Sequence, residues 1–438
     1  MKTEKRLASE MKDSGVGWIG EIPEGWKIEK IGRSFETISS GTTPESSNLK
    51  YYEDGTINWV VTGDLNNSKL VACTNKITSL AMHDYSTLKI YPKNSLLIAM
   101  YGATIGKISL LDVEACTNQA CCVLSGSQLF DMRFVFYWFY TSKEHIISLS
   151  YGGGQPNISQ KLIRSLRLPR ASMFEQETIV SFLDSETSKI QQLIGAKTKQ
   201  IELLQEHEKS LIHHTVTKGL DPKAKMKYSG VKWIGEIPEG WGAKPISREY
   251  EVQLGKMLQP EPSQDAELKP YLRTANVFWN NFDLTEVNEM YVSSREKDQF
   301  SIVPGDLLVC EGGDVGRSAI WMGKIQECYI QNSLHRIRPL GKNQNKFLYY
   351  CLFAANSKGE VEKVCSKATI AHYTLVKIKR TKVPIPSPAE QKIISSFLDS
   401  ETSKIHNAID KIENEIVKLE EYRKSLIYEV VTGKVKVS

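Results

Sequence analysis

Two stretches of the chain repeat almost letter for letter at a single fixed offset. Residues 14–26 read SGVGWIGEIPEGW and residues 229–241 read SGVKWIGEIPEGW, an offset of 215. Residues 175–190 and 390–405 share the sequence SFLDSETSKI at the same offset. Since two periods of 215 account for all but eight of the 438 residues, we expect a chain built as two copies of one scaffold.

Between the repeated stretches lie two blocks of 148 residues, 27–174 and 242–389, whose sequences are far less alike. A duplication followed by uneven drift would produce this pattern. The alternative is that both copies kept one scaffold geometry while the two blocks acquired different ligands. The near identity of the shared stretches favours the second interpretation.

The shared stretches that begin at Glu175 and Glu390 are predicted to be long helices. Ser172 and Ser387 each stand three residues before a glutamate, which is the pattern of a capping box. Neither stretch contains proline until after residue 217 or 432.

Apolar residues within these helices recur with the alternating spacing of three and four that is typical of a coiled-coil seam. The seam residues are Leu183, Ile190, Ile194, Ile201, Leu204, Leu211, Leu398, Ile405, Ile409, Ile412, Ile416, Leu419, Leu426 and Val430. A single helix of this kind needs a partner, and the other copy is the nearest one. Lys197, Glu208 and Arg423 interrupt the seam, where they either fix the register or reach solvent.

The two variable blocks read as mixed α/β. Short β-like runs are broken by Gly, Pro, Asn and Asp, for example at 95–100 and 306–310, and an aromatic helix-like stretch follows at 132–140 and 346–353. The predicted fold class is therefore α+β, with two mixed α/β domains, two long antiparallel coiled-coil helices and a pseudo-two-fold internal duplication. The predicted segments are 1–26 (shared), 27–174 (first variable domain), 175–217 (central helix), 218–241 (linker), 242–389 (second variable domain) and 390–438 (C-terminal helix and tail).

The net charge of +5 is distributed unevenly. Block 27–174 has 15 Lys and Arg against 11 Asp and Glu, and block 242–389 has 20 against 16, so each carries +4. The remainder has 21 against 24, which gives −3. Phosphate binding needs a positive excess where contact occurs, and the variable blocks are where the excess lies.

Neither a membrane segment nor a secretory signal is recognisable, because no apolar run approaches the roughly 20 residues that span a bilayer. The eight cysteines form no CxxC pair and have no His at zinc-ligand spacing. We expect reduced, structural cysteines in a cytoplasmic protein.

Catalytic motifs are absent or incomplete. Gly102–Lys107 superficially resembles a phosphate-binding loop, but it is one residue short and lacks the Ser or Thr that binds magnesium. The chain has no Asn/Asp-Pro-Pro-aromatic motif of the kind that amino-methyltransferases use. We therefore expect no metal site, no catalytic residues and no chemistry by this chain alone.

The order of variable block and capped helix, given twice, resembles the specificity subunit of type I restriction–modification enzymes. The WIGEIPEGW element before each block fits that family. So do Ser40-Gly-Thr-Thr-Pro44, the Leu-Leu-(Ile/Val) runs leading to Gly106-Lys107 and Gly316-Arg317, and the exits at Leu168-Pro169 and Val383-Pro384. The resemblance covers essentially the whole chain.

This resemblance implies two target recognition domains, 27–174 and 242–389, each reading one half of a bipartite, asymmetric site in double-stranded DNA. It also implies two modification (methyltransferase) subunits and, in addition, restriction (translocase and nuclease) subunits as partners. S-adenosylmethionine, ATP and Mg would then be bound by those partners and not by this chain.

Candidate DNA contacts are polar residues in the Gly-rich loops of the two blocks, although each such loop can also be an ordinary turn. The candidates are Lys107, Asn118, Gln119, Gln155, Asn157, Lys161, Arg273, Asn276, Arg317, Gln331, Asn332, Lys367 and His372.

Two other functions remain open from the residues alone. A coiled-coil adaptor with two protein-binding domains and no DNA role would explain the helices and the duplication, but not the boundary motifs. A self-sufficient DNA methyltransferase or nuclease would need motifs that the sequence lacks.

Overall fold

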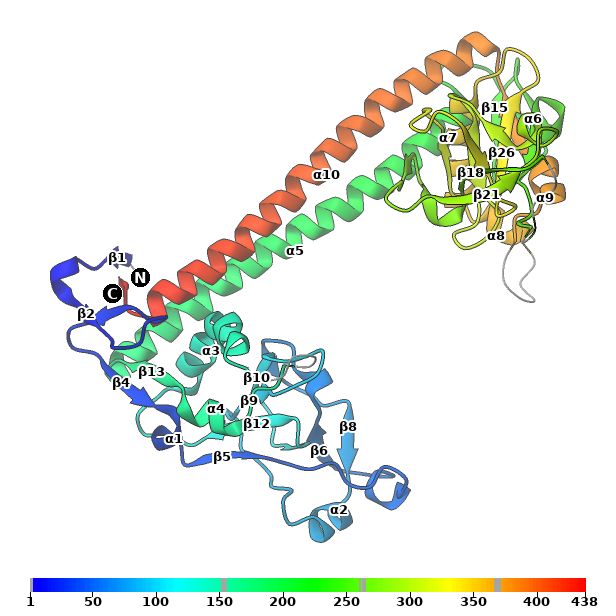
Figure 1. Ribbon diagram of the computed structural model, residues 1–438. Coiled ribbons are helices and arrows are strands. Elements are labelled where there is room, and N and C mark those ends of the chain that lie inside the picture. The colour runs from blue at the N-terminus through cyan, green and yellow to red at the C-terminus, as the bar shows by residue number, and fades with distance from the viewer. Residues whose placement is uncertain (1–2, 151–155, 260, 262–264, 366–371) are drawn as a thin grey trace. The chain divides into compact units, whose positions relative to one another are not determined.

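The computed structural model describes residues 3–150, 156–259, 261, 265–365 and 372–438. The chain divides into two compact units, Met1–Lys197 with Asn414–Ser438, and Thr198–Glu413. Helices α5 (Met173–Lys218) and α10 (Pro388–Val431) contribute to both units (Figure 1). The first half of α5 therefore belongs with the last part of α10, and the remaining parts belong together in the second unit.

The first unit holds a five-stranded sheet, ordered β5-β12-β9-β10-β7, beside a three-stranded sheet, ordered β11-β6-β8. The bounds are β5 Thr37–Ser40, β12 Cys121–Ser125, β9 Leu96–Ala99, β10 Ile108–Leu111, β7 Lys69–Leu70, β11 Cys116–Thr117, β6 Ile57–Val60 and β8 Asn75–Ile77. Paired ribbons are β1 (Thr3–Lys5) with β28 (Val435–Val437), β2 (Met11–Asp13) with β3 (Glu21–Pro23), and β4 (Lys27–Lys30) with β13 (Arg167–Arg170). The shorter helices are α1 Ile31–Ser34, α2 Ser79–Asp84, α3 Met132–Ser148 and α4 Gln160–Ser165.

The second unit holds two four-stranded sheets, ordered β17-β26-β23-β24 and β21-β18-β25-β22. The bounds are β17 Tyr250–Leu254, β26 Leu334–Pro339, β23 Leu307–Cys310, β24 Ser318–Ile320, β21 Asn288–Val292, β18 Glu267–Leu272, β25 Cys328–Ile330 and β22 Ser301–Ile302. Paired ribbons are β14 (Met226–Tyr228) with β15 (Glu236–Pro238), β16 (Gly242–Pro245) with β27 (Lys382–Ile385), and β19 (Val277–Phe278) with β20 (Asn281–Phe282). The helices are α6 Lys297–Phe300, α7 Asn345–Ser357, α8 Glu360–Val364 and α9 Leu375–Arg380.

The two variable blocks have the same strand order despite their dissimilar sequences. The order β5-β12-β9-β10 in the first block matches β17-β26-β23-β24 in the second, with the same antiparallel pairing throughout. In each block an aromatic helix, α3 or α7, covers this sheet and packs into the main hydrophobic core of its unit. Divergent side chains therefore fill one shared backbone plan, which confirms the predicted α+β duplication.

The two long helices pair in opposite directions within each unit. In the first unit Gln191 Oε1 accepts from Arg423 Nη1 at 2.9 Å, and Lys197 pairs with Glu415, so the numbering rises along α5 and falls along α10. In the second unit His406 Nε2 lies 2.8 Å from Glu208 Oε1. The predicted seam residues are all buried or half-buried. The three charged seam residues thus make contacts between the helices, where the sequence left solvent as an alternative.

The helix starts follow the capping prediction only in part. At α10, Ser387 Oγ donates to Glu390 Oε2 at 2.7 Å, and Glu390 N donates back to Ser387 Oγ. At α5 only the serine half forms, because the Glu175 carboxylate turns to Arg6 and Trp26 instead.

Candidate nucleic-acid interface

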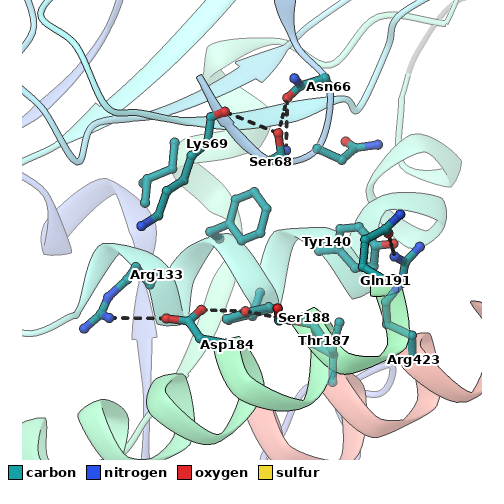
Figure 2. Close-up of a pocket in the computed structure, with 15 residues that line it drawn as sticks. Asn66, Ser68, Lys69, Arg133, Tyr140, Asp184, Thr187, Ser188, Gln191 and Arg423 are labelled. Atoms are coloured by element: carbon teal, nitrogen blue, oxygen red, sulfur yellow. Dashed lines mark hydrogen bonds and ion pairs between the residues drawn. The ribbon is translucent and has the colours of Figure 1, made fainter. Parts of the chain in front are cut away.

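A polar latch fastens the first variable block to its long helix. Tyr137 on α3 donates its hydroxyl hydrogen to Asp184 Oδ1 on α5 at 2.7 Å, and Thr187 Oγ1 lies 3.2 Å from the same hydroxyl. Arg133, one turn earlier on α3, reaches Asp184 Oδ2 at 3.4 Å, as Figure 2 shows. Burial and the neighbouring carboxylate raise the pKa of Tyr137, so the phenol stays protonated and continues to donate.

The second unit repeats this latch. Tyr350 on α7 donates to Asp399 Oδ1 at 2.6 Å, and Lys346 lies 3.0 Å from the same carboxylate. Asp184 and Asp399 both stand in the repeated SFLDSETSKI sequence, 215 residues apart. The repeated letters therefore include the residues that hold a variable block in place.

Two further pairs of contacts follow the same offset. Trp26 Nε1 donates to Glu175 Oε2 at 3.0 Å, and Trp241 Nε1 donates to Glu390 Oε1 at 3.2 Å. Gln176 and Gln391 are both fully buried, and each accepts from a backbone N–H just before the aromatic helix. This set of contacts explains why WIGEIPEGW and EQ are repeated in both copies.

A cavity of about 790 Å³ lies beside the latch of the first unit. Its wall combines the outer face of α3 with α5, α10 and the turn from Asn66 to Lys69 (Figure 2). Many of its polar groups bind one another. Ser68 donates to Asn66 Oδ1 at 2.7 Å, and Arg423 lies over the Tyr140 ring at 5.7 Å. We interpret this cavity as part of the junction between block and helix.

The candidate loops of the first block converge at one edge of its sheets. Ile158 N donates to the Met100 carbonyl at 2.7 Å, and Asn118 N donates to the Val60 carbonyl at 3.0 Å. Thr43 Oγ1 donates to Gln119 Oε1 at 2.6 Å. Loops that lie far apart in the sequence are thereby joined into one surface.

The second block joins the corresponding loops with the same backbone bonds. Tyr373 N donates to the Glu311 carbonyl at 2.7 Å, and Gln331 N donates to the Leu272 carbonyl at 3.1 Å. The exposed His372 ring lies against Gly312, where an added Cβ would meet its Nδ1 at 3.6 Å. Each block thus presents one composite loop edge, the kind of surface from which side chains can reach DNA bases.

Several predicted contact residues have structural roles within their own domain. Arg317 donates to the Thr274 carbonyl at 2.8 Å and lies over the Phe278 ring. Asn276 is buried, and its amide donates to the Asp283 and Glu286 carbonyls. Arg273 pairs with Glu286 at 3.2 Å.

The other candidates differ in exposure. Gln119, Asn157, Lys161 and His372 are exposed, whereas Lys107, Asn118, Gln331 and Asn332 are half-buried. Asn118 Oδ1 accepts from Ala120 N, and Gln331 Oε1 accepts from Ser333, so both brace turns. Gln155 and Lys367 lie outside the described residues. Direct contact with bases stays a prediction for all of these residues.

The family model described as "Type I restriction modification DNA specificity domain" matches this chain twice, at residues 23–203 and 238–417. Together the two matches cover well over half of the chain. The chain belongs to this type I DNA specificity family.

Curated relatives agree over nearly the full length. The type I restriction enzyme MjaVIII specificity subunit of Methanocaldococcus jannaschii is 24% identical over 430 residues, 95% of this chain and 94% of that protein. The putative MjaX specificity subunit of the same organism is 24% identical over 437 residues, 96% of each chain.

Solved structures share the fold of this specificity-family chain. A chain from a study of complex assembly and conformational transition in the type I R-M system aligns with a TM-score of 0.71 at 16% identity. The alignment covers 94% of this chain and 99% of that one. The HsdS subunit of Thermoanaerobacter tengcongensis aligns with a TM-score of 0.55 at 16% identity, covering 94% and 98%.

Sequence reasoning missed the latch residues of the specificity domains. Tyr137 and Tyr350 are 213 residues apart, as are Arg133 and Lys346. The aromatic helices could have been aligned at that offset, because Tyr137-Trp138 and Tyr350-Cys351 occupy equivalent turns. The offset of 215 in the shared stretches hid this match.

Burial dominates the chemistry of the thiols in both specificity domains. All eight cysteines are free, and seven of them are buried. Burial raises the pKa of Cys73 to about 11 and that of Cys116 to about 12, so these thiols are protonated and unreactive near neutral pH. Among the described residues, no group of three or more His, Cys, Asp and Glu side chains is arranged to hold a metal ion. None of the described helices is long and apolar enough to cross a membrane.

Proposed function

We propose that this chain is the DNA-recognition subunit of a type I restriction–modification complex. In this role each variable domain reads one half of a bipartite, asymmetric site in double-stranded DNA. The observation that carries the proposal is the pairing of one strand order with two unlike loop edges on a repeated scaffold. Two equal frames with different loops suit two different half-sites.

In this proposal the chain positions partner subunits and does no chemistry itself. Two modification subunits supply S-adenosylmethionine and the methyl transfer, and restriction subunits supply ATP- and Mg-dependent translocation and cleavage. The incomplete phosphate-loop pattern at Gly102–Lys107 supports this division of labour. The complex would act on DNA in the cytoplasm.

The adaptor alternative is not favoured, because the matching family model is that of a DNA specificity domain and covers both variable blocks. It also gives no reason for both blocks to carry a positive excess.

Mapping methylated adenines across the genome tests the proposed function. Deleting the gene should erase methylation at one bipartite motif, and restoring the full-length chain should return that motif. A deletion that leaves every methylated motif in place would contradict the proposal.

A further inference from the structure

The positive charge of each variable block is concentrated in two short segments. In the first block, segments 27–34 and 160–170 hold seven of the 15 Lys and Arg but only one of the 11 acids, Glu29. The rest of that block then has eight cations against ten acids. We call these two segments the first basic patch.

The fold brings the two segments of the first basic patch together. Helix α1 packs on α4, and β4 pairs with β13. Gly32 permits the close approach, because a Cβ there would lie 2.9 Å from the Arg164 carbonyl oxygen. A cleft of about 570 Å³ opens between the helices, and none of its lining residues is acidic: Lys30, Gly32, Arg33, Gln160, Lys161, Arg164 and Ser165.

Like charges face one another directly in this patch. Lys30 lies opposite Arg167 in the β4–β13 ribbon, and both side chains are exposed. Lys27 lies opposite Arg170, and only Arg170 has a carboxylate partner, Glu29 at 3.2 Å. Like charges in register destabilise a strand pair, so an anionic ligand would relieve this arrangement.

The second block has a counterpart at the same place in the fold. Segments 242–249 and 375–385 hold six cations and one acid, which leaves 14 cations against 15 acids elsewhere in that block. The acid, Glu249, pairs with Lys244 at 2.6 Å. We call these segments the second basic patch; its cations are Lys244, Arg248, Lys377, Lys379, Arg380 and Lys382.

The two patches agree in charge but not in sequence. Helix α4 begins at Gln160 and α9 at Leu375, exactly one repeat of 215 apart, yet Lys161 corresponds to Val376 and Ser165 to Arg380. A cleft of about 480 Å³ beside α9 is lined by four cations and by one acid, Glu360. A positive surface is therefore present in both copies although the individual residues differ.

Each basic patch continues directly from its loop edge. Ile158, which bonds to Met100 in the first loop edge, is followed by Gln160, whose Nε2 donates to Ser40 Oγ at 2.8 Å. In the second block Tyr373 bonds to Glu311, and Lys377 of α9 reaches back to the His372 carbonyl. A duplex that touches the loops would therefore extend over α4 or α9.

We infer that the two basic patches bind the sugar–phosphate backbone of duplex DNA beside the bases that the loop edges read. The inference rests on the proposed function and adds a second kind of contact to it. Lys and Arg on phosphates release counterions and fix the register of the protein, but they do not distinguish sequences. The patches thus supply affinity, and the loop edges supply specificity.

Salt-dependent binding of the full-length chain to a fluorescent 40-base-pair duplex of mixed sequence tests this inference. The variant Arg33→Ala/Lys161→Ala removes two exposed patch cations. The matched control, Lys89→Ala/Lys93→Ala, removes two exposed cations from the segment leading into β9, at the end of that strand away from the Met100 loop. Net charge falls equally in both variants.

The patch variant should lower the slope of log K against log salt by about 1.8, since each phosphate contact contributes about 0.9. Its affinity at 0.1 M salt should fall on the order of tenfold. The control should change little, and Arg33→Lys/Lys161→Arg should keep the original slope. Equal thermal unfolding of all variants shows that folding is unaffected.

The outcomes separate the two proposals. If the unaltered chain binds and the patch variant loses no more affinity than the control, the basic patches are not phosphate sites and the proposed function stands. If the unaltered chain does not bind duplex DNA at any salt concentration, both the patches and the proposed function are contradicted.

Discussion

His335 shows how burial fixes the charge of a single residue. It is fully buried in β26, its Nε2–H donates to the Tyr373 carbonyl at 2.8 Å, and burial lowers its pKa to about 4, with Lys379 adding to the effect. An unfolded histidine titrates near 6.5, so the unfolded chain takes up the proton first as pH falls. This residue's stabilising effect is therefore complete above about pH 6.5 and is lost as pH falls toward 4.

We expect the second unit to lose about 2 kcal/mol of unfolding free energy between pH 7 and pH 5 through His335. Thermal unfolding at both pH values, compared with His335→Gln, measures this contribution. The variant should show a weaker pH dependence, and an identical dependence in both proteins would contradict the assignment.

Gly41 carries a different constraint, which is space. A Cβ at this position would lie 1.7 Å from the Thr117 carbonyl oxygen, and Gly255 meets Gln331 in the same way at 2.2 Å. Gly41→Ala should therefore destabilise the first unit by roughly 1–3 kcal/mol or more through overpacking. Gly63→Ala is the matched control, because nothing lies within 4 Å of its added Cβ. Equal melting temperatures for the two variants would show that the contact is unimportant.

Residue type alone was a poor guide to individual contacts. Arg317 was predicted to face DNA because it follows a Gly-rich loop, yet it turns inward to Thr274 and Phe278, about forty residues earlier in the chain. The sequence cannot reveal such a contact, since the fold alone brings the two segments together. The cations of the first basic patch were divided between two segments for the same reason, and only Lys161 was recognised.

At the scale of elements, the latch between α3 and α5 makes a specific prediction. Tyr137→Phe removes the hydroxyl that donates to Asp184, and it should cost about 1–2 kcal/mol because the acceptor is charged. Hydrogen exchange should become faster in α3 while α7 of the second unit is unchanged. Tyr350→Phe is the matched control and should produce the opposite pattern. Exchange that rises equally in both helices would contradict two independent latches.

The long helices were predictable because their apolar spacing is local. Their predicted starts at 175 and 390 lie within two residues of the observed ones, and the predicted seam residues are buried or half-buried. The strand order of the variable blocks was not predictable, because parallel pairs such as β11–β6 join residues almost sixty positions apart. Only runs such as 95–100 could be recognised as strands, and β9 occupies Leu96–Ala99.

For the whole molecule, the repeat at 215 determines what can be exchanged. Glu175, Gln176, Asp184 and Thr187 on α5 have identical counterparts 215 residues later on α10, and they hold the variable block in each unit. Residues 242–389 should therefore dock in the place of residues 27–174, because both segments have 148 residues and meet the same helix residues.

The central claim is that each variable block reads its own half-site. The most direct measurement is methylome sequencing of cells whose chain carries residues 242–389 in both positions. The account predicts that one half of the methylated motif disappears and that the other half appears twice, as an inverted repeat. An unchanged motif, or a motif with two new halves, would contradict the claim.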